Sequence, residues 1–201
     1  MQPAGASRAL ALAVWPERVS RLIQALLLVI GGTLILTLSA KIQVPFYPVP
    51  MTLQTLGVMA IAAAYGSRLA VATVVLYLIE GFVGLPVFAG AAAGPLYLIG
   101  PTGGFLAGFV VLAFIVGTAV DRGWDRSAPK LFATLVAADV VVFAMGFAWL
   151  AWAAQLPNGH VGTGMAYAWS GGLEPFILGD LLKIVLTALA VPATWLLVDR
   201  K

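Results

Sequence analysis

Long runs of apolar residues, separated by short polar or glycine- and proline-rich stretches, dominate the pattern of this chain. A helix that crosses a bilayer needs about 20 mostly apolar residues. Two of the runs are short, and only Gly66, Ser67 and Arg68 separate them, which indicates a tight helical hairpin. The pattern predicts six transmembrane helices, at residues 19–40, 51–65, 69–82, 105–120, 130–153 and 176–198.

Two connections between these predicted helices differ from ordinary solvated loops. Segment 81–104 has 24 residues with seven glycines, three prolines and no charge, and segment 41–50 has three prolines. Loops of such length are uncommon unless they have a function, so we expect segment 81–104 to fold back over the outer mouth of the bundle. The predicted fold class is an all-α integral membrane protein, a single domain over residues 1–201. Its six transmembrane helices would carry a long apolar Gly/Pro-rich outer loop between helices 3 and 4.

The composition agrees with a membrane protein and excludes several kinds of site. Apolar residues make up 62% of the chain and charged residues 9%, whereas a soluble domain has about 25% charged residues. The absence of cysteine and the single histidine exclude cysteine nucleophiles and multi-histidine metal clusters. Segment 81–104 lacks the lysine of a phosphate-binding loop. We therefore predict no metal, no cofactor and no nucleotide site.

The distribution of basic residues predicts the orientation in the membrane. With the N-terminal segment 1–18 in the cytoplasm, only Lys41 lies outside and Lys183 lies within the sixth span. Cytoplasmic loops are enriched in Lys and Arg, so both termini are predicted to be cytoplasmic. These residues are then topology signals rather than a nucleic-acid-binding surface. The nine predicted cytoplasmic residues are Arg8, Arg18, Arg21, Arg68, Arg122, Arg126, Lys130, Arg200 and Lys201.

Two charges within the sixth span are the first candidates for function. A charged side chain at the bilayer centre costs about 2.5–3.5 kcal/mol on insertion scales. Asp180 and Lys183 are three residues apart and therefore share a helix face. They could bind a small polar ligand, or they could be a structural ion pair between helices.

Further candidate ligand-binding residues lie near the predicted outer loops. Glu80 ends the third span, and Gln43 and Gln54 flank segment 41–50 with amide groups that can form hydrogen bonds. Tyr77 and Phe88 are candidates to pack against a ligand.

Two features of the predicted helices remain. Gly104 and Gly108 form a G-x-x-x-G pattern that predicts a close helix–helix contact. Asp139 lies deep in the fifth span, and the sequence assigns it no role.

A membrane-embedded hydrolase using Asp139, His160 and Ser170 is an alternative, but no helix presents a buried nucleophile beside a base. We therefore predict that the protein is not an enzyme.

Four blocks of sequence, in order, resemble a known family. They are VPMTLQTL at 49–56, GLPVFAG at 84–90, GPTGGFLAGF at 100–109 and PFILGDLLK at 175–183. These are similar to blocks of the BioY family, the biotin-specific substrate-binding (S) components of energy-coupling-factor (ECF) transporters. The resemblance covers about two thirds of the chain.

This resemblance implies a six-helix protein of a prokaryotic cell membrane that captures biotin from the outer side. Asp180 would accept a ureido N–H of biotin, and Lys183 would orient Asp180 or donate to the ureido oxygen. The remaining contacts would come from Glu80 at the head group, Tyr77 and Phe88 around the ring, and Lys41, Gln43 or Gln54 at the carboxylate.

The resemblance also implies partners. Uptake would proceed with or without an energising module, which consists of a transmembrane coupling subunit and two ATPase subunits. The lipid bilayer is the other expected partner. Whether the chain also forms a homo-oligomer is a question that the sequence leaves open. An S component for a different vitamin is the alternative within the same class.

Overall fold

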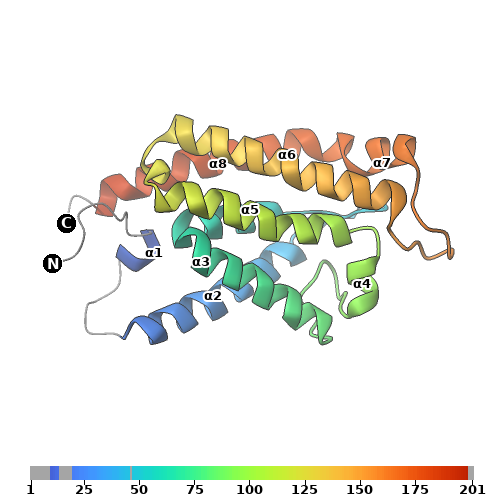
Figure 1. Ribbon diagram of the computed structural model, residues 1–201, viewed down its shortest axis with the longest axis horizontal. Helices are drawn as coiled ribbons and strands as arrows, with labels where there is room; N and C mark the ends of the chain where they lie inside the picture. Colours follow the sequence, from blue (N-terminus) through green and yellow to red (C-terminus); the bar gives the residue numbers. More distant parts are fainter. Residues whose placement is uncertain (1–9, 14–19, 46, 199–201) are drawn as a thin grey trace.

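The computed structural model describes residues 10–13, 20–45 and 47–198. Within them the chain is mostly helical, and five helices are long and apolar enough to cross a membrane (Figure 1). These helices are α2 (Arg21–Lys41), α3 (Gln54–Phe82), α5 (Gly103–Asp121), α6 (Ala128–Trp152) and α8 (Glu174–Val198).

The predicted N-terminal segment 1–18 is described only at the short helix α1 (Leu10–Ala13). Four of the basic residues used to predict the orientation, Arg8, Arg18, Arg200 and Lys201, lie outside the described residues.

The helical bundle has two distinct ends (Figure 1). The α4 end contains α4 (Pro95–Ile99), the connection 153–164 and the short helix α7 (Met165–Gly172). The η1 end contains the 3-10 helix η1 (Trp124–Arg126) and the C-terminus of α5.

The predicted second and third spans correspond to one element, α3, which is broken at Gly66. This residue has φ 73° and ψ 175°, a conformation that glycine adopts without strain. The Asp121 carboxylate at the end of α5 accepts hydrogen bonds from the backbone N–H and the hydroxyl of Ser67. Helix α3 therefore has two helical parts, and the break lies where the turn was predicted.

Helix α5 is the most buried of the five long helices and packs against both α3 and α6. Small residues permit these contacts. A Cβ atom on Gly117 would collide with the backbone of Ser67, and one on Gly104 would collide with Trp149. A Cβ on Gly108 would lie 3.1 Å from Val142 Cα. The close contact predicted from the G-x-x-x-G pattern is confirmed.

Helix α2 is the least buried of the five. It begins after Ser20, whose hydroxyl accepts a hydrogen bond from the backbone N–H of Ile23, as is usual for a helix N-cap. Much of its surface is apolar and exposed, through Leu22, Ile23, Leu26, Leu27, Ile30, Leu34, Ile35 and Leu38.

A short β-hairpin follows α2 and was not included in the all-α prediction. Strand β1 (Gln43–Val44) pairs antiparallel with β2 (Met51–Thr52), with Gln43 opposite Thr52. The connection between the strands lies within the proline-rich segment 41–50. Because β2 ends two residues before α3 begins, the hairpin is held close to the start of that helix.

The segment 83–102 between α3 and α5 is attached to α2 through Lys41. The Nζ atom of Lys41 donates hydrogen bonds to the carbonyl oxygens of Pro86 at 2.5 Å, Phe88 at 2.7 Å and Gly90 at 2.5 Å. An ammonium group has three donors, so all of them are used on the backbone of this segment.

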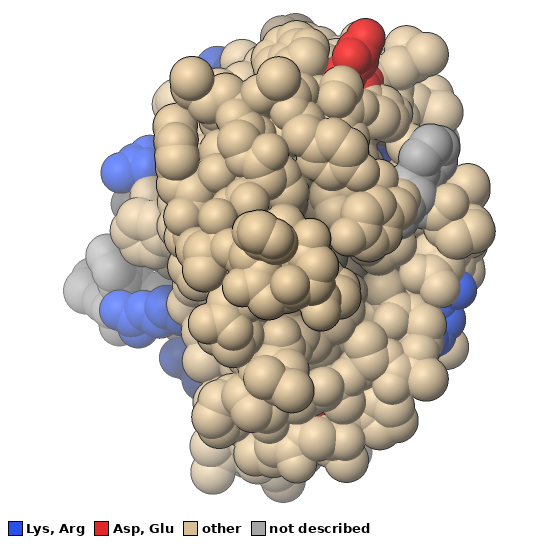
Figure 2. All heavy atoms as spheres, turned by 90° about the vertical axis from the view of Figure 1, so that its right-hand side faces the viewer, with Lys and Arg blue, Asp and Glu red and all other residues tan. Residues whose placement is uncertain are grey.

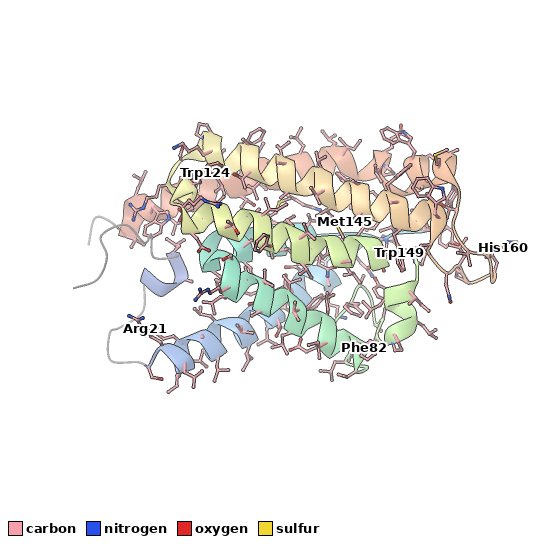
Figure 3. All side chains as sticks on the ribbon, in the orientation of Figure 1. Arg21, Phe82, Trp124, Met145, Trp149 and His160 are labelled. Carbon is pink, nitrogen blue, oxygen red and sulfur yellow. The ribbon has the colours of Figure 1, made fainter. Side chains whose placement is uncertain are left out.

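Two other helices also bind this segment. The Tyr77 hydroxyl in α3 donates to the carbonyl oxygen of Val87 at 3.0 Å. The Trp149 indole in α6, near the α4 end in Figure 3, donates to the carbonyl oxygen of Gly100 at 2.9 Å. Buried carbonyl groups need such partners. Side chains from α2, α3 and α6 thus fix the backbone of segment 83–102.

Candidate ligand-binding site

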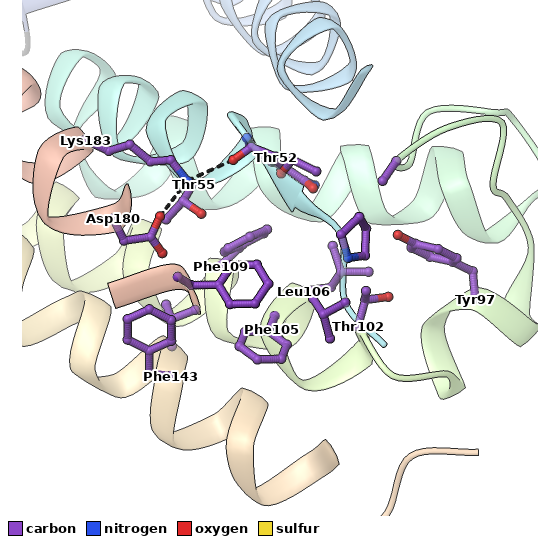
Figure 4. A pocket seen from close by; sticks show the side chains of 16 residues that line it. Thr52, Thr55, Tyr97, Thr102, Phe105, Leu106, Phe109, Phe143, Asp180 and Lys183 are labelled. Atoms are coloured by element: carbon purple, nitrogen blue, oxygen red, sulfur yellow. Dashed lines mark hydrogen bonds and ion pairs between the residues drawn. The ribbon is translucent and has the colours of Figure 1, made fainter. Parts of the chain in front are cut away.

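A cavity of about 540 Å³, its open mouth included, lies among four of the long helices (Figure 4). Its walls come from α3, α5, α6 and α8, with the hairpin and segment 83–102 completing them. The lining residues are Val49, Pro50, Thr52, Gln54, Thr55, Ala89, Tyr97, Thr102, Phe105, Leu106, Phe109, Val142, Phe143, Phe176, Asp180 and Lys183.

Asp180 and Lys183 form an ion pair at one end of the cavity. They are 4% and 7% exposed. Lys183 Nζ donates to Asp180 Oδ1 at 2.5 Å and to the carbonyl oxygen of Thr52 at 2.8 Å. The prediction that the two side chains meet on one face of the helix is confirmed.

The pair retains hydrogen-bonding capacity toward the cavity. The third ammonium hydrogen of Lys183 and the Oδ2 atom of Asp180 take part in none of the hydrogen bonds between described residues. Both residues line the cavity. This end can therefore accept a hydrogen bond from a ligand and donate one to it.

Aromatic and aliphatic side chains form the middle of the cavity. Phe105 and Phe109 are four residues apart on α5 and so share one face, and Phe143 approaches from α6 (Figure 4). Phe176 lies one helical turn before Asp180 on α8. These groups exclude water and suit the apolar part of a ligand.

The other end of the cavity is polar again. Tyr97 of α4 and Thr102, just before α5, lie there, away from the Asp180–Lys183 pair (Figure 4). The Thr102 hydroxyl oxygen is buried and makes no hydrogen bond of regular geometry with the described residues, although the Tyr97 hydroxyl is close enough to interact with it. A buried polar group of this kind can bind a ligand that provides the missing partner.

The structure brings three of the eight candidate residues to the cavity wall, namely Gln54, Asp180 and Lys183. Gln54 is 5% exposed, and its Nε2 atom donates to the Tyr77 hydroxyl at 2.9 Å. The Tyr77 hydroxyl in turn donates to the carbonyl oxygen of Val87. Tyr77 is not a lining residue; it holds the Gln54 side chain from behind.

Phe88 also lies behind the cavity wall. Its ring packs edge-on against Tyr77, with centroids 5.5 Å apart, and stacks on Tyr97 at 4.9 Å. Both separations are typical of favourable aromatic pairs. Tyr97 lines the cavity, and Phe88 therefore supports the Tyr97 ring from behind the cavity wall.

The remaining three candidates lie away from the cavity wall. The Lys41 ammonium binds the backbone of segment 83–102. Gln43 is exposed in β1, and Glu80 is half-buried near the end of α3. None of the three is among the residues that line the cavity.

Several lining residues were not candidates from the sequence. Phe176, Asp180 and Lys183 are spaced by four and three residues, a helical spacing that extends the face of the pair. This signal could have identified Phe176. Thr52 and Thr55 lie beside Gln54 in one of the sequence blocks, but periodicity does not distinguish them from other small polar residues.

The residues of the hydrolase alternative do not form a nucleophile–base pair. The Ser170 hydroxyl donates to the carbonyl oxygen of Ala166 within α7. His160 is exposed on connection 153–164 (Figure 3), and Asp139 is buried in α6. No hydrogen bond between described residues joins any two of these three side chains, so the alternative gains no support.

Comparisons with known proteins agree on a single family. The model described as "BioY family" matches residues 9–200. "Biotin transporter BioY" of Thermotoga maritima is 35% identical over 157 residues, covering 78% of this chain and 87% of the relative. "Biotin transporter BioY2" of Lactococcus lactis subsp. cremoris is 29% identical over 170 residues, covering 85% and 88%.

A solved structure has a similar fold. It is described as the S-component for biotin from an ECF-type ABC transporter, and it matches with a TM-score of 0.71 at 23% sequence identity. The match covers 87% of this chain and 93% of that chain. The helical arrangement described above is therefore one that a known S component also has.

Proposed function

This chain belongs to the BioY family, and we propose that it is a biotin transporter protein whose cavity binds biotin as an S component. The main support for this proposal is the cavity, which has polar groups at both ends and the buried Asp180–Lys183 pair at one of them. The relatives, which match most of their own length, are described as biotin transporters. The function is that of a transporter, with biotin as substrate.

The chemistry of biotin suits the order of groups along the cavity. Its ureido ring has two N–H donors and one carbonyl acceptor, and we place it at the Asp180–Lys183 end. Asp180 Oδ2 would accept a ureido N–H, and the third donor of Lys183 would bind the ureido oxygen. Hydrogen bonds to charged groups each contribute about 1.5–3 kcal/mol, so this end would supply much of the affinity.

The rest of the biotin molecule would extend from the Asp180–Lys183 pair toward the α4 end of the protein. The thiophane ring and the alkyl chain would pack against Phe105, Phe109 and Phe143, and the carboxylate would lie near Thr102 and Tyr97. Of the other candidates, Gln54 would contact the ligand, whereas Tyr77 and Phe88 would support Gln54 and Tyr97 from behind. We propose that Lys41, Gln43 and Glu80 support the site from outside the cavity.

We propose six membrane crossings, with the two parts of α3 crossing separately on either side of Gly66. The η1 end would face the cytoplasm and the α4 end the outside. Described basic residues agree with this arrangement, since Arg21, Arg68, Arg122, Arg126 and Lys130 lie toward the η1 end. The α4 end, which faces the viewer in Figure 2, is mostly uncharged. Biotin would then enter from the outside.

Within an ECF transporter, the partners would be a transmembrane coupling subunit and two ATPase subunits. The chain itself would need no cofactor. Helix α2 is the least buried of the long helices, and its exposed apolar surface would contact lipid or the coupling subunit.

The test is equilibrium binding of labelled biotin to the purified, detergent-solubilised protein. We expect tight binding that Asp180→Asn weakens by about 100-fold, because the substitution removes a charged acceptor and leaves Lys183 buried without its partner. Glu174→Gln, which changes an exposed carboxylate in the first turn of α8, is the matched control and should bind normally.

Two outcomes would contradict the proposal. A well-folded wild-type protein that does not bind biotin would exclude biotin as substrate, and direct binding measurements with thiamine, riboflavin and folate would then identify another vitamin. Normal biotin binding by Asp180→Asn would exclude the proposed role of this residue.

A further inference from the structure

Asp139 is a buried carboxyl group next to the proposed site and has no assigned role. It lies near the middle of α6 and is 5% exposed. Val142 and Phe143, three and four residues later, line the cavity, so Asp139 lies on the same face of α6. At a rise of 1.5 Å per residue, it is about 5 Å closer to the η1 end than these two residues.

The charges around Asp139 belong to the ion pair. Asp139 interacts electrostatically with Asp180 and Lys183, both on α8. The other helices packed against α6 carry few ionisable groups: α7 has only Tyr167, and α5 has only Asp121, at its last residue. On α8, Glu174 is exposed in the first turn, next to the end of α7. The rest lie at the η1 end, where η1 has Asp125 and Arg126 and α6 itself has Lys130.

Two buried carboxyl groups therefore lie under the influence of one buried ammonium group, which is paired with only one of them. Lys183 donates to Asp180 and to the Thr52 carbonyl oxygen. Asp139 Oδ1 is buried and has no hydrogen-bond partner among the described residues. With both carboxyl groups ionised, the cluster would have a net negative charge away from water, which is costly in the membrane interior. With one proton added, it would be neutral.

We propose that Asp139 is a positioning residue that holds this proton, so that the Lys183 ammonium stays with Asp180 and the ligand. This inference rests on the proposed function, because it concerns the same site. An ionised Asp139 would compete with Asp180 for Lys183 and draw the ammonium away from the cavity. Removing the proton should therefore weaken ligand binding even though Asp139 does not line the cavity.

The first test is a pH series of biotin binding for wild type, Asp139→Asn and Glu174→Gln. Asparagine has nearly the shape of a protonated aspartate but cannot ionise. We expect wild-type affinity to fall by about tenfold for each pH unit once Asp139 loses its proton. Asp139→Asn should bind within about threefold of wild type at neutral pH and show no such fall. Glu174→Gln should follow the wild-type profile.

Two results would overturn the inference. One is a pH profile of Asp139→Asn that coincides with that of the wild type. The other is weakened biotin binding by Asp139→Asn at every pH, as expected for Asp180→Asn. Such a result would mean that binding needs the ionised Asp139 carboxylate.

The second test does not depend on biotin or on the folding of one variant. Infrared spectroscopy of the protein without ligand should show the C=O stretching band of a protonated carboxylic acid at neutral pH. The band should disappear in Asp139→Asn. If the asparagine variant does not fold, Asp139→Glu replaces it, and the band should then shift. A spectrum unchanged by both variants would overturn the inference. If the wild type binds no biotin, the proposed function fails, yet this measurement still decides whether Asp139 is protonated.

Discussion

Lys41 and Lys183 hold the two ends of the binding region in different ways. Lys41 is exposed, and its three donors bind carbonyl oxygens of segment 83–102, which supplies Ala89 and Tyr97 to the cavity. Lys183 is buried, is paired with Asp180 and lines the cavity itself.

The difference follows from the solvation of the two ammonium groups. An exposed ammonium keeps contact with water and can therefore bind neutral carbonyl groups without a carboxylate. A buried ammonium needs a negative partner, because desolvation of an unpaired charge is expensive. Lys41 thus positions the backbone of a loop, whereas the Lys183–Asp180 pair brings charge to a ligand. Substitutions at the two lysines should separate these roles.

The largest effect is expected for Lys183→Met. The variant leaves Asp180 buried without its partner, and breaking a buried ion pair in this way destabilises a protein by about 3–5 kcal/mol. Biotin binding should be lost, and thermal unfolding in detergent should move to a clearly lower temperature. The measurements are the unfolding temperature and equilibrium biotin binding.

A double variant makes this prediction sharper. Asp180→Asn combined with Lys183→Met removes both charges and should recover much of the stability, but not the binding. If the double variant recovered both, the pair would be a structural element only, which is the alternative that the sequence left open.

A smaller effect is expected for Lys41→Met. The variant loses three hydrogen bonds to segment 83–102 while the Asp180–Lys183 pair stays intact. Because Lys41 is exposed, water can replace part of each bond. We expect labelled biotin to dissociate about tenfold faster, which corresponds to about 1.4 kcal/mol. Lys41→Arg, which keeps the charge, should dissociate more slowly than Lys41→Met; equal rates for wild type and Lys41→Met would show that this contact does not retain the ligand.

The sequence was sufficient to predict the parts of the site that depend on local spacing. Apolar runs of the right length predicted α2, α5, α6 and α8 to within a few residues. The three-residue spacing of Asp180 and Lys183 predicted their contact, because spacing along a helix determines which side chains share a face. The break at Gly66 was also predicted from a local signal, a short polar stretch between two apolar runs.

Contacts between distant segments could not be predicted in this way. The acceptors of Lys41 are backbone carbonyl groups 45 to 49 residues away, and every residue has such a group. The Thr52 carbonyl oxygen that binds Lys183 is 131 residues away in the sequence and is positioned by a hairpin that the apolar pattern did not indicate. The family resemblance implied a contact between Lys41 and the carboxylate of biotin; in the structure the Lys41 ammonium binds neutral backbone carbonyl groups.

The smallest effect is expected for Tyr77→Phe, which tests whether the support behind the cavity matters for affinity. The substitution removes a hydroxyl that accepts from Gln54 Nε2 and donates to the carbonyl oxygen of Val87, while the ring that packs against Phe88 remains. One net hydrogen bond contributes about 0.5–1.5 kcal/mol, so we expect biotin affinity to fall by about threefold. Tyr167→Phe on α7, an exposed tyrosine outside the cavity wall, is the control in the same titration. Equal affinities for the two variants would mean that Gln54 keeps its orientation without Tyr77, and the cavity wall alone would then position the ligand.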